Sequence, residues 1–167
     1  MSQKEKLEKC FREGERAGER HKGIRKIETS KELTENYIKK AFHNLGAVSD
    51  FKNSGYSDWS ASAAFYSLYH LLLAIISKQG YESRNQSCTF ALIEDLIDSG
   101  QVDLTKEELR EIFDSDVTED LEHSSKILDM RETMQYSSKT SMEDEEFNKL
   151  FIRTKFLFDK LRLEAEK

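Results

Sequence analysis

Histidines and carboxylates are the side chains of this chain best suited to acid–base or metal chemistry, and both are scattered. The four histidines lie far apart along the sequence: His21, His43, His70 and His123. No glycine-rich phosphate loop, GxSxG turn, HExxH helix or EF-hand loop occurs. The acidic runs at residues 94–95, 119–120 and 143–146 have the spacing of solvated helix faces rather than of a catalytic pair. We therefore expect neither metal catalysis nor a bound cofactor.

The two cysteines, Cys10 and Cys88, are far apart, with no CxxC motif and no neighbouring pair of histidines. Disulfide frameworks and zinc sites usually show short, repeated cysteine spacings. The pattern predicts neither, and a reducing cytoplasm is the default location. The first ten residues, MSQKEKLEKC, are charged where a secretory signal needs an apolar core.

Length and composition indicate one helical domain. The chain has 167 residues, with 37% hydrophobic and 35% charged residues, no proline and seven glycines. The lack of proline and the few glycines leave little room for a series of short strands and turns. The net charge of −6 disfavours nucleic-acid binding by the whole surface but leaves a local basic cleft open. His21 lies among Arg20, Lys22 and Arg25, a patch that could meet phosphate, although a solvated charge run is the simpler interpretation.

Residues 57–80 are expected to form the central helix. Ser57 and Asp58 are suitable N-cap residues, Gly80 ends the segment, and no proline or glycine interrupts it. The helix is apolar nearly all round, which predicts burial on several sides. Its strictly apolar run, residues 71–76, is much shorter than the roughly 20 residues that a bilayer requires. We therefore expect a core helix and no membrane span.

The flanking segments predict further helices. Thr29 or Ser30 caps an amphipathic helix that ends at residues 53–55, and a polar loop at residues 81–87 precedes a short helix ending near residue 100. Thr105 and Glu108 form a capping box before a helical stripe that reaches residue 128, with a break near residues 114–118. Ser141 marks the start of the last helix.

Together these elements predict an all-α fold, an antiparallel up-and-down bundle of four long helices plus a shorter one. We divide the chain into a charged N-terminal arm, residues 1–28, and a bundle domain, residues 29–167. Three glycines weaken any helix in the arm, so a short helix at residues 7–12 followed by a loosely held segment is expected.

The central helix also carries a family resemblance. The segment AFYSLYH at residues 64–70, followed by an apolar turn and KQGY at residues 78–81, resembles the second helix of archaeal and bacterial HEPN domains. The resemblance extends from residue 11 to about residue 161. It implies a helical bundle that associates as a homodimer.

Active HEPN ribonucleases carry an arginine, four to six residues and then a histidine, and the motifs of two protomers meet in a dimer cleft. This chain has Arg131 and Tyr136 at the corresponding positions. The resemblance implies metal-independent RNA cleavage, in which a 2′-hydroxyl attacks its own phosphodiester. The planar fork of an arginine suits phosphate. A tyrosine, with an ordinary pKa near 10, is ionised to only about one part in a thousand at neutral pH, so a direct general-base role is weak. It can still donate a hydrogen bond or stack on a base.

Structural alternatives exist for both basic candidates. Arg131 could be an ordinary helix-terminal arginine that pairs with Asp129, Glu132 or Gln135, and His70 is best interpreted as a hydrogen-bonded core histidine.

Three functions follow from the sequence. The first is a HEPN module that binds RNA or a nucleotide in a dimer cleft, as part of a toxin–antitoxin or defence system. The second is a metal-independent endoribonuclease with a degenerate motif. The third is a non-catalytic partner of a nucleotidyltransferase, as some HEPN proteins are.

Overall fold

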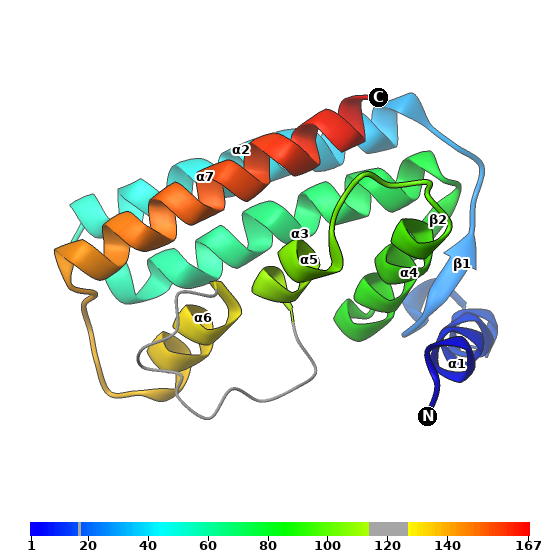
Figure 1. Ribbon diagram of the computed structural model, residues 1–167, viewed down its shortest axis with the longest axis horizontal. Coiled ribbons are helices and arrows are strands. Elements are labelled where there is room, and N and C mark those ends of the chain that lie inside the picture. The colour runs from blue at the N-terminus through cyan, green and yellow to red at the C-terminus, as the bar shows by residue number, and fades with distance from the viewer. Residues whose placement is uncertain (17, 114–126) are drawn as a thin grey trace.

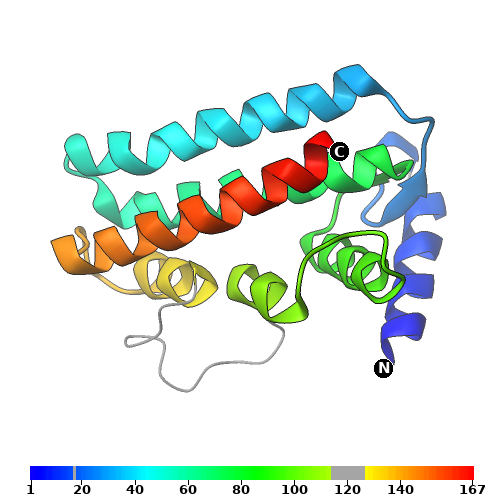
Figure 2. The same ribbon diagram turned by 45° about the horizontal axis from the view of Figure 1, so that its top comes forward.

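The computed structural model describes residues 1–16, 18–113 and 127–167, and most of them are helical. Within these ranges three long helices run along the molecule: α2 (Lys31–Asn53), α3 (Ser60–Lys78) and α7 (Asp144–Glu166) (Figure 1). α2 and α7 pack on one side of α3, and the shorter helices α4 (Gln86–Asp98), α5 (Lys106–Ile112) and α6 (Ile127–Tyr136) cover the other side (Figure 2). The predicted all-α bundle is confirmed, with this last layer made of several short helices.

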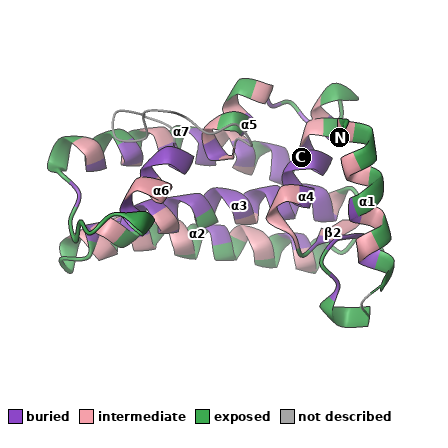
Figure 3. Cartoon of the chain, turned by 90° about the horizontal axis from the view of Figure 1, so that it is seen from below, coloured by how far each residue is buried: buried purple, intermediate pink, exposed green. Residues whose placement is uncertain are grey.

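α3 is the central helix, as predicted. It follows a 3₁₀ turn, η2 (Ser57–Trp59), and 15 of its 19 residues are buried, which Figure 3 shows as a nearly continuous buried helix. By length and composition the stretch Ser57–Lys78 could cross a membrane, but 83% of its most apolar part is buried inside the protein. Central helices of folded domains meet the same criterion, so this finding is weak evidence for a membrane span.

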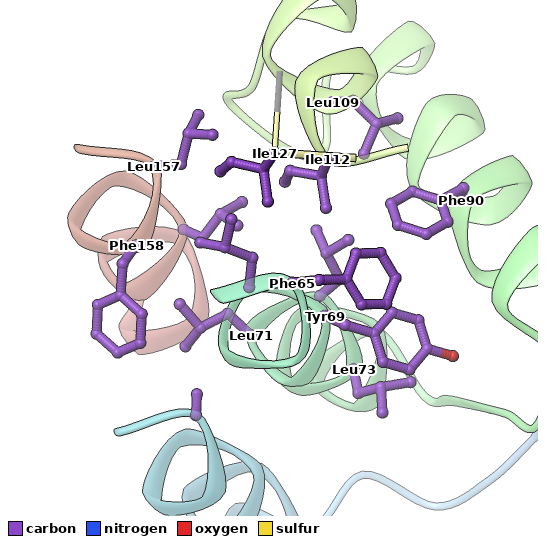
Figure 4. Packing of buried hydrophobic residues seen from close by; sticks show 14 of the residues in the cluster. Phe65, Tyr69, Leu71, Leu73, Phe90, Leu109, Ile112, Ile127, Leu157 and Phe158 are labelled. Carbon is purple, nitrogen blue, oxygen red and sulfur yellow. The ribbon is translucent and has the colours of Figure 1, made fainter. Parts of the chain in front are cut away.

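The core extends from α3 in two directions. Phe65 of α3 lies near Phe90 of α4, with ring centres 6.5 Å apart, and Phe90 stacks on Phe113 at 4.3 Å. On the other side, Leu71 of α3 and Phe158 of α7 are both fully buried (Figure 4). One continuous apolar cluster therefore joins the two layers.

Two of the predicted helix caps are confirmed. Ser30 Oγ accepts a hydrogen bond from the backbone N–H of Leu33 at the start of α2, and Thr105 and Glu108 form the reciprocal capping box of α5. The prediction for Ser57 was wrong, because the N-cap of α3 is Trp59 and no side chain caps it. α7 begins after Glu143, so the start predicted at Ser141 is also wrong.

The N-terminal segment is packed against the bundle rather than loosely held. α1 (Gln3–Arg16) is longer than the predicted short helix, and a 3₁₀ turn, η1 (Gly18–Arg20), leads to β1 (Ile24–Lys26). β1 pairs antiparallel with β2 (Tyr81–Ser83), in a segment that was predicted to be a loop. A Cβ atom at Gly14 would overlap the backbone of Ile24. Glycine therefore allows close backbone packing here, and this contact offsets the low helix propensity.

The expectation that the two cysteines do not pair was wrong. Cys10 of α1 and Cys88 of α4 form a disulfide, with Cα atoms 5.7 Å apart. The antiparallel pairing of β1 with β2 brings the segments that follow α1 and precede α4 together. Cysteines separated by 78 positions thereby become neighbours, which local spacing does not reveal.

Candidate functional site

A pocket of about 430 Å³ lies where η2 and the start of α3 face the end of α6. Its volume is within the range of small-molecule sites. η2 and α3 form one wall with Asp58, Trp59, Ser62 and Tyr66. α6 and the segment after it form the second wall: Arg131, Met134, Gln135, Ser137, Ser138, Lys139 and Thr140.

Tertiary contacts fix the second wall against the first. The backbone N–H of Met142 donates to Ser57 Oγ at 2.7 Å, and both residues are buried. Just beyond, Lys52 of α2 pairs with Asp144 at 3.1 Å, and its ammonium group lies 4.4 Å from the centre of the Phe147 ring. The hydroxyl that sequence reasoning assigned to a helix cap therefore positions the segment between α6 and α7.

Arg131 lies in the pocket on an aromatic support. Its guanidinium carbon is 4.2 Å from the centre of the fully buried Phe65 ring and 5.6 Å from that of Tyr66. Cation–π contacts of this kind are worth about 0.5–2 kcal/mol. Within the part of the chain that the structure describes, no carboxylate forms an ion pair with Arg131, and its buried Nε has no hydrogen-bond partner. Among the contacts of the described residues, no hydrogen bond or ion pair joins Arg131 to Asp129, Glu132 or Gln135, the partners considered as an alternative.

Tyr136 does not share this pocket with Arg131. It is the last residue of α6, its side chain is 81% exposed, and it is absent from the pocket walls. Five helical positions rotate a side chain by about 140° around the axis, so the two residues occupy different faces of α6. Met134 and Gln135, three and four positions after Arg131, line the pocket instead.

The aromatic side chains of the first wall were not predicted as site residues. Trp59 is 57% exposed and Tyr66 is 37% exposed, although both belong to the segment predicted to be buried. Trp59 and Tyr66 lie on the same stripe of the central helix, at steps of three and four residues. This periodicity is the sequence feature that could have identified them as site residues. Periodicity alone does not say which stripe a neighbouring helix leaves uncovered.

His70 is half-buried beside this wall rather than fully in the core. Its Nδ1–H donates to the backbone carbonyl of Tyr66 at 2.7 Å, one turn earlier. Burial lowers the pKa of His70 below the ordinary value of 6.5, with the Tyr66 carbonyl acting in the opposite direction. The side chain is hydrogen-bonded as expected, and it does not line the pocket.

The residues around His21 were expected to form a solvated run of charges, but His21 itself is not solvated. His21 is 1% exposed, its Nδ1 accepts from the N–H of Gly23, and its Nε2 lies 3.0 Å from the Glu82 carboxylate. It links the turn before β1 to β2. Among the described residues no group of three histidine, cysteine or acidic side chains could hold a metal ion. His123 lies outside the described residues.

The structure is thus a small helical bundle with an arginine-containing pocket at the start of its central helix. The family model of the HEPN domain matches residues 34–162, well over half of the chain. The protein therefore belongs to the HEPN family, and the resemblance seen in the sequence is confirmed. A comparison with curated proteins gives no match.

Proposed function

We propose that this HEPN protein binds RNA or a nucleotide through the pocket that contains Arg131, in a cleft between two copies of the chain. The observation that supports it most is the guanidinium of Arg131, which rests on Phe65 without a carboxylate partner among the described residues. A guanidinium over an aromatic ring can still donate hydrogen bonds to a phosphate from its edge.

The second part of the proposal concerns Tyr136 and the dimer. Its ring is exposed at the end of α6, next to the segment that forms the second wall. Exposed aromatic side chains are enriched at interfaces, and a two-fold axis near this point would bring Tyr136 of one copy towards the pocket of the other. In that arrangement Arg131 and Tyr136 contribute to one composite cleft.

The cellular role that fits is part of a toxin–antitoxin or defence module in the cytoplasm. Cytosolic thiols are kept reduced, so in that compartment Cys10 and Cys88 would form a disulfide only transiently. Neither Cys10 nor Cys88 lines the pocket that contains Arg131.

The test is RNA and nucleotide binding by the wild-type protein and Arg131→Ala. Loss of hydrogen bonds to a charged group is expected to weaken binding by about 1.5–3 kcal/mol. Arg12→Ala is the matched control, because Arg12 is exposed on α1 and lines no part of this pocket. Unfolding curves for both variants separate lost binding from lost folding. Unchanged affinity in Arg131→Ala for every RNA and nucleotide would contradict the proposal and favour a structural partner of a nucleotidyltransferase.

The endoribonuclease alternative has its own measurement. Tyr136→His introduces a group that titrates near neutral pH at the position of the family histidine. If the wild-type protein already cleaves RNA in the presence of a chelator, and Arg131→Ala abolishes the cleavage, the protein is an enzyme. If only Tyr136→His cleaves, the wild-type protein is a binding module with the remains of a catalytic cleft.

A further inference from the structure

The pocket contains one negatively charged side chain in addition to its positively charged ones. Asp58, in η2, is half-buried in the first wall, directly before Trp59. Among the described residues no side chain or backbone N–H bonds to its carboxylate and no cation pairs with it. The carboxylate of Asp58 therefore has hydrogen-bonding capacity left for a ligand.

Trp59 adds a flat apolar surface beside this carboxylate. More than half of its side chain is exposed, and it lines the same wall as Tyr66. Stacking of a nucleobase on such a side chain is worth about 1–3 kcal/mol and does not depend on base identity. Trp59 can therefore hold a base but cannot select one, so selection falls to the polar groups around it.

The charges of the pocket have opposite signs on its two walls. Arg131 and Lys139 belong to the second wall and Asp58 to the first. A phosphate is attracted to the second wall and repelled by the first, so the other end of a bound nucleotide, the base, meets Asp58. A carboxylate accepts hydrogen bonds and donates none at neutral pH.

The bases differ in what they offer to such an acceptor. The Watson–Crick edge of guanine carries two adjacent donors, N1–H and the N2 amino group, which match the two oxygens of a carboxylate. Cytosine and adenine each offer one amino group next to a ring acceptor, and uracil offers one N–H between two carbonyls. An acceptor-only group therefore favours guanine, and repulsion from the ring acceptors disfavours the others.

We infer that the pocket is selective for guanine. The base stacks on Trp59, its Watson–Crick edge donates to Asp58, and its phosphate binds Arg131 and Lys139. The inference rests on the proposed function, since it assigns a base to the same phosphate site. The guanine can belong to a free nucleotide or to an unpaired residue of RNA, because both present the same edge and a phosphate.

Trp59 is the only tryptophan of the chain, so its fluorescence reports on this pocket alone. We would titrate the protein with GMP, AMP, CMP and UMP, and with short single-stranded RNAs that contain either one guanine or none. GMP or the guanine-containing RNA is expected to quench Trp59 and to bind at least about tenfold more tightly than its counterparts, since a lost charged hydrogen bond costs about tenfold or more. A response to the RNA but not to GMP identifies RNA as the source of the base.

Asp58→Asn is the decisive variant. It is nearly isosteric and exchanges one acceptor for a donor, so guanine affinity is expected to fall about tenfold. Adenine affinity is expected to rise, because an amide can accept from the adenine amino group and donate to the neighbouring ring nitrogen that a carboxylate repels. Asp95→Asn, on the exposed surface of α4, is the matched control and should retain the guanine preference. Calorimetry with Trp59→Leu, in which all four nucleotides should bind more weakly, tests the stacking independently of fluorescence.

These measurements distinguish a pocket that lacks guanine selectivity from one that does not bind phosphate at all. If the four nucleotides and both RNAs bind equally, Asp58→Asn changes nothing and Arg131→Ala still weakens binding, guanine selection is overturned and the phosphate site stands. If no nucleotide or RNA binds to the wild-type protein, both are overturned.

Discussion

Arg131 has a structural contact and a proposed ligand contact at the same time. Its guanidinium carbon lies 4.2 Å from the centre of the ring of Phe65, a fully buried side chain of the core. The position of the guanidinium is therefore set by α3, whereas the backbone of Arg131 belongs to α6. Lysine would keep the charge but lose the planar stacking and the paired donors, so Arg131→Lys is not a conservative change at this position.

His70 predicts a pH dependence of folding. Burial lowers the pKa of its imidazole in the folded protein below 6.5, so the unfolded chain binds more protons between those two values. The free energy of unfolding is expected to fall as the pH drops through this window, and the contribution of His70 levels off below the folded pKa. Urea unfolding at pH values from 7.5 to 5 measures it.

His70→Gln should flatten this part of the pH profile, whereas His43→Gln, at an exposed position on α2, should leave it unchanged. An identical profile in the wild-type protein and His70→Gln would show that burial of this imidazole has no influence on stability.

At the scale of elements, α3 organises the bundle because other elements cover most of its surface. Leu72 is fully buried in it. Leu72→Ala is expected to lower the free energy of unfolding by about 2–5 kcal/mol, through lost apolar burial and the cavity left behind. Chemical denaturation measures the change. Leu163→Ala on α7, where the side chain is exposed, is the matched control and should cost well under half as much. Equal losses in both variants would refute the central position of α3.

Elements specified by local chemistry were predictable from the sequence, and those specified by tertiary contact were not. Ser30, Thr105 and Glu108 act on backbone groups within one helical turn, and their roles could be read directly. Ser57 is an equally good cap residue, but its hydroxyl bonds to Met142, 85 positions away. For the site, the family pattern identified Arg131. Predicting Trp59 as a site residue would have required knowing which face of α3 the helix α6 leaves uncovered.

At the scale of the whole molecule, we expect a dimer. Light scattering at micromolar concentration should give twice the mass of the 19.5 kDa chain. Tyr136→Glu should shift the mass towards the monomer, because it places a charge in the proposed interface. Phe156→Glu is the control on the exposed face of α7. A monomeric wild-type protein would contradict the composite cleft, and dissociation by Phe156→Glu alone would place the interface on α7.

The Cys10–Cys88 disulfide has a consequence for how the chain responds to a protease. The bond closes residues 10–88 into a covalent ring that contains α2, α3 and both strands. One cut inside the ring, for example in the turn at residues 54–56, opens it into a single branched molecule whose two pieces separate only when reductant is added. One cut after residue 88 releases a free fragment at once. Paired gels with and without reductant therefore report whether the backbone was cleaved inside or outside residues 10–88, and whether the bond was closed in the sample.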